Sequence, residues 1–121
     1  MNLIAHVEIP VRDLERAMKF YAAVLDIEFE SVQQIHGSRM AFFPFEPGKD
    51  GASGALCQGD VYVPTHDGGI IYFGVEDIDA ALETAVSLGS EILFEKIALA
   101  TGGFVAEISD GEGNRIALQT V

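Results

Sequence analysis

The sequence contains two related segments, and this internal repeat restricts the folds that the chain can adopt. Residues 4–25 read IAHVEIPVRDLERAMKFYAAVL, and an offset of 64 residues places them on residues 68–89, GGIIYFGVEDIDAALETAVSLG. Each copy has an apolar strand-like stretch, then Val-x-Asp followed by Leu or Ile, then apolar residues at helical spacing. Asp13 and Asp77 hold matching positions, where a side-chain oxygen caps the first turn of a helix. The repeat therefore predicts two copies of a strand–helix unit.

Three further strands are predicted after each helix. In the first copy they cover residues 28–35, 39–44 and 55–63, with a glycine-rich loop at 45–54. In the second copy they cover residues 91–97, 104–109 and 115–121, and the last two are joined by a tight DGEGN turn. The pattern predicts a single α+β domain, residues 1–121, with module one at about 1–64 and module two at about 69–121. Two tandem βαβββ modules would form a curled, mostly antiparallel sheet around a cavity, with the helices on the outer faces.

Composition excludes several classes of partner. The formal net charge of −12 repels phosphate, so neither nucleic acid nor an anionic membrane is expected as a partner. No apolar run approaches the roughly 20 residues that a membrane-spanning helix needs. Cys57 is the single cysteine, so an internal disulfide is impossible and a cytoplasmic location is predicted. The same residue is interpreted as a small buried apolar side chain.

Three motifs in order resemble one protein family. The segment 6–14 reads H-V-x-(hydrophobic)-x-V-x-D-L, the following helix contains Phe20-Tyr21, and residues 110–118 read DGEGNRIAL. Together with the duplication they resemble the vicinal oxygen chelate superfamily, which includes glyoxalase I, bleomycin-resistance proteins and extradiol dioxygenases. Gly111 stands where the family commonly has proline. The resemblance covers essentially the whole chain, and it implies sites built between facing modules, often across a homodimer.

The resemblance also implies where a metal would be held. The metal enzymes of the superfamily have ligands at four positions, which here are His6, Ala55, Ile70 and Ala117. A divalent cation needs several N, O or S atoms converging on one point, and three of these residues offer only hydrocarbon. We therefore predict no cofactor and no metal ligands, with His6 the only retained family position. A divalent metal held by His6 and atypical partners is the alternative.

Strand alternation suggests which residues would face the predicted cavity. The expected ligand contacts are mostly apolar, as in other small-molecule sites, and are His6, Phe42, Cys57, Ile70, Tyr72, Ala117 and Gln119. The first hypothesis is a protein that binds a small apolar or aromatic molecule there. The second is a glyoxalase-like lyase, isomerase or dioxygenase with His6, Glu8 and Glu107 as candidate catalytic residues. In it, either His6 holds a metal with atypical partners, or a metal-free pair, His6/Glu8 or His6/Glu107, transfers a proton next to a carbonyl. In the third, Phe42 and Tyr72 fill the cavity and the protein acts only as a dimeric interaction partner.

The simplest structural reading of Glu8 is an ordinary surface carboxylate. In that reading Glu8 pairs with Arg115 or reaches solvent, because carboxylates avoid unpaired burial.

Overall fold

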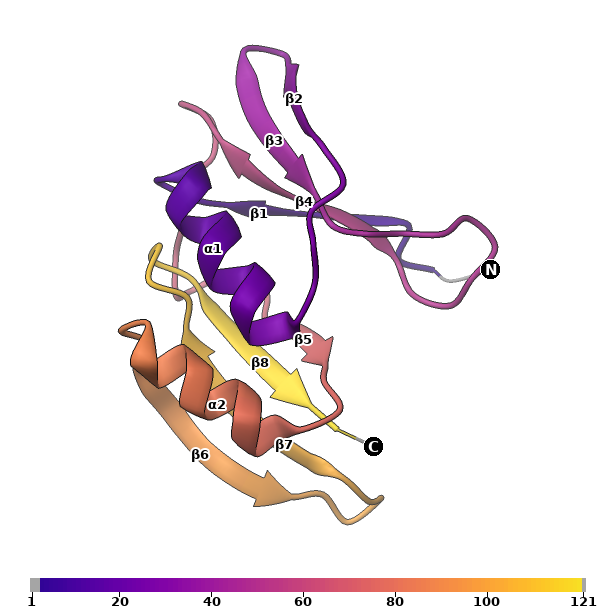
Figure 1. Ribbon diagram of the computed structural model, residues 1–121, viewed down its shortest axis with the longest axis vertical. Coiled ribbons are helices and arrows are strands. Elements are labelled where there is room, and N and C mark those ends of the chain that lie inside the picture. The colour runs from indigo at the N-terminus through magenta and orange to yellow at the C-terminus, as the bar shows by residue number, and fades with distance from the viewer. Residues whose placement is uncertain (1–2, 121) are drawn as a thin grey trace.

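The computed structural model describes residues 3–120, and its elements repeat the order βαβββ twice (Figure 1). Met1, Asn2 and Val121, at the outer ends of the predicted modules and of the predicted last strand, lie outside the described residues. Module one contains β1 (His6–Pro10), α1 (Leu14–Leu25), β2 (Val32–Ile35), β3 (Ser38–Phe42) and β4 (Ser53–Gln58). Module two contains β5 (Ile71–Gly74), α2 (Ile78–Ser87), β6 (Ile92–Ala98), β7 (Phe104–Ser109) and β8 (Arg115–Gln119). The predicted α+β class is confirmed.

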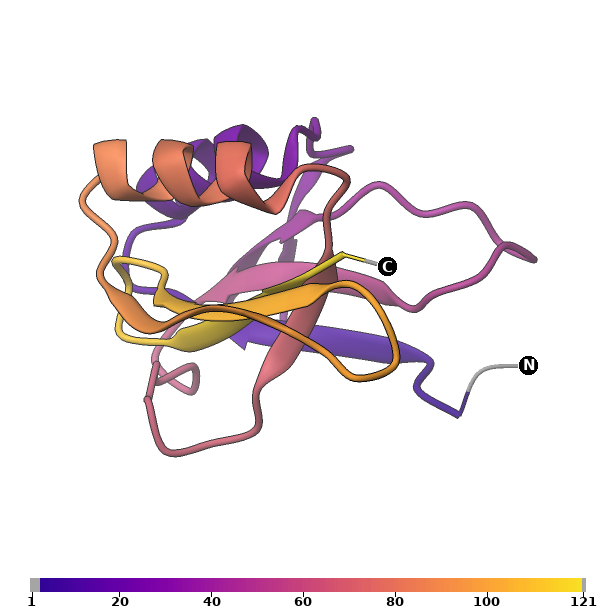
Figure 2. The same cartoon turned by 90° about the horizontal axis from the view of Figure 1, so that it is seen from below.

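Each module forms its own four-stranded sheet. The strand orders are β1-β4-β3-β2 in the first sheet and β5-β8-β7-β6 in the second. In both sheets the first and last strands of the module pair in parallel, and the other pairs are antiparallel. Consequently β1 and β5 are both edge strands. The sheets are curled but do not close into a barrel, and the two helices lie side by side in one layer on the same side of both sheets (Figure 2).

Both helices start as the sequence predicts. The Asp13 carboxylate accepts a hydrogen bond from Arg16 N at 3.1 Å, and Asp77 accepts one from Ala80 N at 3.0 Å. Gly89 follows α2 at a φ of +93°, a left-handed conformation that suits glycine. Neither helix of the described chain is long and apolar enough to cross a membrane.

Two predicted strands are longer than the strands in the structure. Residues 55–63 were expected to be extended, but β4 ends at Gln58 and the chain then turns. Tyr62 N donates to Gly59 O at 3.0 Å, which closes that turn. Gly59 is required here because a Cβ atom would lie 2.1 Å from Ser38 Oγ. The strand predicted at 28–35 likewise begins only at Val32.

A single apolar core joins the two modules. Leu14, Ala17 and Tyr21 of α1 are fully buried in it, together with Ile108 and Leu118 of the second sheet. The Tyr21 ring lies at the centre of an aromatic group, at centroid distances of 5.3, 6.0 and 5.7 Å from Phe20, Phe43 and Phe73. Residues of both modules therefore share one apolar core, with α1 packed inside it.

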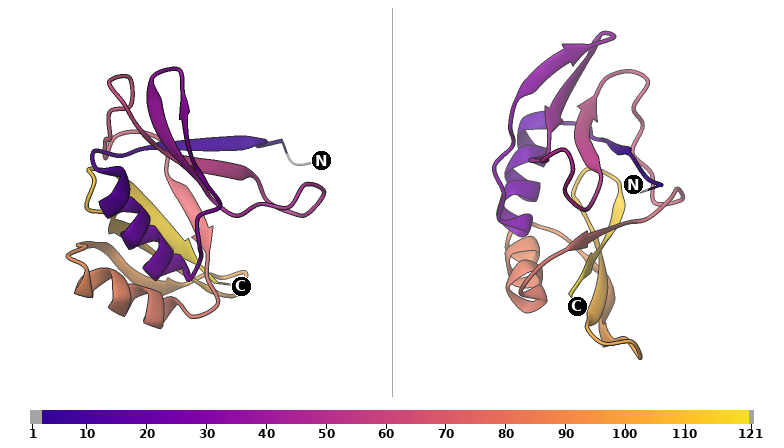
Figure 3. Two further views of the ribbon diagram at one scale, coloured as in Figure 1. Left: turned by 45° about the horizontal axis from the view of Figure 1, so that its top comes forward. Right: turned by 90° about the vertical axis from the view of Figure 1, so that its right-hand side faces the viewer.

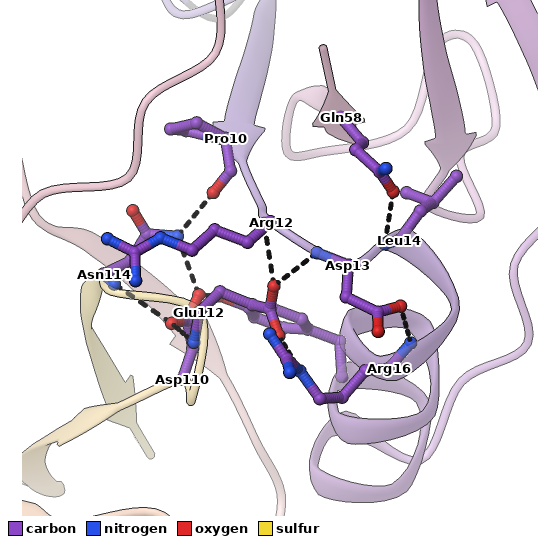
Figure 4. Close-up of polar contacts among 10 residues, drawn as sticks. Pro10, Arg12, Asp13, Leu14, Arg16, Gln58, Asp110, Glu112 and Asn114 are labelled. Carbon is purple, nitrogen blue, oxygen red and sulfur yellow. Dashed lines mark hydrogen bonds and ion pairs between the residues drawn. The ribbon is translucent and has the colours of Figure 1, made fainter. Parts of the chain in front are cut away.

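The β7–β8 turn holds α1 in place through Glu112. This glutamate is 1% exposed. Its Oε1 accepts the backbone N–H groups of Arg12 and Asp13, both at 2.8 Å, and its Oε2 accepts Arg16 Nε at 2.6 Å (Figure 4). These are N–H groups at the start of a helix, which have no partner inside the helix and attract a negative charge. A carboxylate of module two therefore caps the helix of module one.

Asp110 and Asn114 complete this connection, and we call Asp110, Glu112 and Asn114 the inter-module hub. Asp110 Oδ2 accepts the Tyr21 hydroxyl at 2.6 Å and Asn114 Nδ2 at 2.8 Å. Its Oδ1 accepts the backbone N–H groups of Glu112 and Asn114 at 2.8 and 3.1 Å. Asn114 Nδ2 also donates to Pro10 O at 2.7 Å. The predicted tight turn is confirmed, and the buried Asp110 carboxylate is hydrogen-bonded through both oxygens.

Candidate functional site

A group of polar side chains in contact lies on the face of the first sheet that points away from the helices. Val7 and Ile9 of β1 pack into the core, so the alternating His6 and Glu8 side chains emerge on the opposite face. His6 Nε2 lies 3.5 Å from Glu8 Oε2, and Glu8 Oε1 accepts the Tyr62 hydroxyl at 2.7 Å. The side chains of His6 and Glu8 are 38% and 37% exposed, so the group is accessible from solvent.

Ser53 fixes the orientation of the His6 ring. The Ser53 hydroxyl lies 2.8 Å from His6 Nδ1 and 3.1 Å from the Ala5 carbonyl oxygen. A serine hydroxyl has one proton, so it either donates to Ala5 O and accepts Nδ1–H, or donates to Nδ1. The other ring nitrogen, Nε2, faces the Glu8 carboxylate. This arrangement can hold or move a proton.

Tyr62 is a site residue that the strand prediction missed. It follows the Gly59 turn, which returns the chain over the face that carries Glu8. The hydrogen bond to the Glu8 carboxylate raises the pKa of the Tyr62 phenol, since ionisation would place two negative charges together. The Gly59-Asp60 pair inside the predicted strand is a turn signal, and it was the sequence clue to this position.

Apolar side chains form a small cluster beside Tyr62. Met40, Ala55 and Cys57 are buried in it, and Phe42 packs against them with Tyr62. Burial, together with the nearby Glu8 carboxylate, raises the pKa of the Cys57 thiol to about 11. Cys57 is therefore a protonated, buried thiol, as the sequence interpretation held. It has no exposed surface for a ligand to contact in this structure.

The corresponding face of the second sheet carries the remaining predicted residues. Tyr72 is 51% exposed, Ala117 beside it is fully buried, and Gln119 and Ile70 are half-buried. Glu107 lies on this sheet, and its Oε1 is 3.1 Å from Arg115 Nε.

Of the two alternatives for Glu8, pairing with Arg115 is wrong, whereas its side chain, which is 37% exposed, does reach solvent. Both residues line one cavity of about 320 Å³, but Arg115 pairs with Glu107 and Glu8 binds Tyr62. The structure brings His6 and Glu8 together, while Glu107 is held in its own ion pair.

A larger cavity lies between the two modules, and we call it the slot. It has a volume of about 420 Å³ and is bordered by the edge strands β1 and β5, by the C-terminal end of α1 and by residues near the β3–β4 loop. The residues that line it are Ile4, Val7, Ile9, Leu25, Ile27, Phe43, Pro44, Ala52, Ser53, Gly54, Ile71, Tyr72, Phe73 and Gly74. Tyr72 alone among the predicted ligand contacts belongs to this set, and Ser53 connects the slot to His6.

The side chains do not fit the metal centre that the resemblance implies. Within residues 3–120, no group of three or more His, Cys, Asp or Glu side chains is arranged to hold a metal ion. Ala55 and Ala117 are fully buried, and Ile70 offers no donor atom. His6 has Glu8 as its one carboxylate neighbour at 3.5 Å, which is too few ligands for such an ion.

Comparison with known proteins identifies the family. Residues 3–118 match the Glyoxalase/Bleomycin resistance protein/Dioxygenase superfamily, and the chain belongs to this family. Comparison with curated proteins gives no match.

Similar crystal structures agree on the fold. A glyoxalase/bleomycin resistance protein from Albidiferax ferrireducens T118 superposes with a TM-score of 0.75 at 22% identity, covering 99% of this chain and 100% of that one. The hypothetical protein SA1046 from S. aureus gives 0.73 at 17% identity, with 100% and 95% covered. Glyoxalase I from Zea mays gives 0.72 at 18% identity, and this chain covers 45% of it. The present chain therefore spans less than half of the maize enzyme, and the similarity is one of fold.

Proposed function

We propose that this protein binds a small apolar or aromatic molecule in the slot, without the metal centre that the family resemblance implies. The observation that carries this proposal is the composition of the slot: about 420 Å³ lined by both modules, with no charged side chain in the lining. Small-molecule pockets typically measure about 300–1,000 Å³ and are mostly apolar with a few polar groups. Ser53 and Tyr72 supply the polar groups here. The large side chains of Ile4 and Tyr72, which line the slot, are 58% and 51% exposed, so a bound ligand could cover them.

Naphthalene is a suitable first probe, because the protein contains no tryptophan and the fluorescence of the probe can be followed directly. At a concentration about 100-fold above its Kd, a ligand stabilises the folded state by about 2.7 kcal/mol. We expect this to raise the Tm by several degrees, measured by differential scanning fluorimetry with an external dye.

Two glycines offer a matched pair of variants. A Cβ atom at Gly74 or at Gly69 meets nothing within 4 Å, but only Gly74 lines the slot. Gly74→Leu should abolish the effect of naphthalene, whereas Gly69→Leu should keep it. If naphthalene and other neutral bicyclic compounds leave the Tm of the wild-type protein unchanged, this function is wrong. An equal shift in both variants would place the binding elsewhere.

A second candidate function is metal-free proton transfer next to a carbonyl group. It is supported by the contact between His6 Nε2 and the Glu8 carboxylate, which Tyr62 holds in position. Exchange of the α-protons of a hydroxyketone in D₂O, followed by NMR, measures this activity. His6→Gln should abolish the exchange and leave naphthalene binding intact. Wild-type exchange no faster than in buffer alone would eliminate this candidate.

The proposal extends to the partners and the location. A homodimer is supported by the exposed apolar side chains Phe94, Ile97 and Phe104 of the second sheet, which a second copy would cover. Sedimentation velocity would detect such a dimer. A cytoplasmic location is consistent with a single, buried, protonated cysteine.

A further inference from the structure

We infer that the slot selects neutral, flat molecules that carry a hydrogen-bond donor and acceptor side by side, as in a lactam or cyclic imide. The carbonyl oxygen of Tyr72 would accept a hydrogen bond from the donor of the ligand, and the N–H of Gly74 would donate one to its acceptor. This inference rests on the proposed function and narrows its class of ligand.

The backbone of β5 has one paired and one open side. Among the described strands, β5 pairs only with β8. Val75 N donates to Gln119 O at 2.9 Å, which orients the backbone groups of Val75 and of the alternate residue Phe73 toward β8. Because successive residues of a strand point to opposite sides, Tyr72 and Gly74 direct their N–H and C=O groups away from β8. Both residues line the slot, so these groups border it.

The open edge of β1 already receives a contact of this kind. Val11 N donates to Cys57 O, so alternation turns the backbone of Pro10 away from β4. Pro10 lacks an N–H, and its carbonyl oxygen accepts a hydrogen bond from the side-chain amide of Asn114 at 2.7 Å. A side-chain amide therefore occupies one position on the open edge of β1, at its last residue. A ligand amide at Tyr72 and Gly74 would do the same for β5.

The rest of the slot requires the ligand to be uncharged and flat. The lining contains no charged side chain, although the chain as a whole carries a net charge of −12. An ion would lose its hydration there without gaining a partner. The rings of Phe43 and Phe73 line the slot with centroids 5.9 Å apart, and they offer surfaces for an aromatic ring.

Three probes of similar size separate these requirements: naphthalene, 2-quinolone and 1-methyl-2-quinolone. Naphthalene tests binding in the slot, and 2-quinolone adds the donor and acceptor. Methylation of the ring nitrogen replaces the donor hydrogen with a methyl group and keeps the acceptor. We expect 2-quinolone to bind about fivefold or more tightly than its methyl derivative by fluorescence titration, a ratio that corresponds to one net hydrogen bond.

Two substitutions at Gly74 test the protein side of the contact. Gly74→Pro removes an N–H that is outside the ladder with β8, a position where an edge strand tolerates proline. Gly74→Ala keeps the N–H and serves as the control. The preference of the protein for 2-quinolone over naphthalene should fall at least severalfold in Gly74→Pro and persist in Gly74→Ala. If the proline variant does not fold, hydrogen exchange in the wild-type protein decides: 2-quinolone must slow exchange of the Gly74 amide, and 1-methyl-2-quinolone must not.

The possible outcomes separate this inference from the proposed function. The inference would be overturned if the protein bound 2-quinolone and naphthalene with equal affinity. If the Gly74→Leu variant then bound neither probe, the slot would still be the binding site. If none of the three probes binds, the proposed function itself fails. Tighter binding of 2-naphthoate than of 2-quinolone would also overturn the inference, because the slot would then accept a charge.

Discussion

The last hairpin connections of the two modules differ more than any strand does. In module two, residues 110–114 form a short turn whose Asp110 and Glu112 are 1% exposed and hydrogen-bond to module one. In module one, the equivalent connection is the loop 43–52, which is mostly exposed and stands out from the first sheet (Figure 3, left). The same structural position therefore holds a buried connection in one copy and an open loop in the other.

This difference assigns separate roles to the two copies. The module-two turn, through the inter-module hub, fixes the helix of module one and the relative position of the sheets. The module-one loop contributes Phe43, Pro44 and Ala52 to the wall of the slot. A duplicated fold can keep its strands and helices while one connection serves stability and the other borders a cavity.

The hub gives the largest expected effect. Asp110→Ala leaves the Tyr21 hydroxyl, the Asn114 amide and two backbone N–H groups without their acceptor in a buried site. Unsatisfied buried groups cost about 1–3 kcal/mol each, and we expect a total loss of about 3–5 kcal/mol in the free energy of unfolding. Urea denaturation followed by circular dichroism measures it. Asp50→Ala in the loop 43–52 should change stability by less than about 0.5 kcal/mol, and similar losses in both variants would remove the contrast.

The thiol of Cys57 tests whether module one also contains a region that solvent and reagents cannot reach. We expect its effect on stability to be smaller than that of Asp110→Ala and larger than that of a longer loop. A pKa of about 11 keeps the thiol protonated, so a disulfide reagent at pH 8 should label it only after unfolding. The folded pKa lies above the unfolded value of 9.0, and the unfolded state therefore loses the proton first as the pH rises. Stability should decrease between about pH 9 and 11 in the wild-type protein, and Cys57→Ala should lack this contribution. Rapid labelling of the folded protein would contradict this prediction, because it would show that the reagent reaches Cys57 past Tyr62.

The smallest effect should come from lengthening the exposed loop. Two glycines inserted between Lys49 and Asp50 extend a loop that is already ten residues long, and loop-closure entropy predicts a cost below about 1 kcal/mol. The same insertion after Gly111 would separate Asp110 from Glu112 and should destabilise the protein far more. Comparison of the two urea midpoints measures the difference. Equal midpoints would mean that the hub is not structurally special.

The fold was largely predictable because its signals are local and repeated. The two aspartate caps, Asp13 and Asp77, and the alternation in the first strand of each module follow from neighbouring residues alone. The end of β4 was less predictable because apolar residues continue through Tyr62 and Val63. Gly59-Asp60 is a local turn signal within that run, and the close approach of Gly59 to Ser38, which is distant in sequence, is what no local pattern shows.

The site was predicted less completely, for a similar reason. Alternation placed His6, Glu8 and Tyr72 on the correct faces of their strands. It did not identify Tyr62 or Ser53, because their contacts with β1 depend on how β4 and the following turn fold back. Alternation also could not show that neighbouring side chains cover Cys57 and Ala117. The slot depends on the spacing of two sheet edges, which no local pattern encodes.

The cap that Glu112 places on α1 has a consequence for the order of events during synthesis. Arg12 and Glu112 lie 100 residues apart, so α1 leaves the ribosome with only its local cap, Asp13, long before the Glu112 carboxylate exists. We expect nascent chains that end before residue 110 to leave the first turn of this helix frayed and the aromatic group around Tyr21 unsettled. Module one would then complete its packing only after the β7–β8 turn has been synthesised, and chaperones would bind module one while it is partly folded.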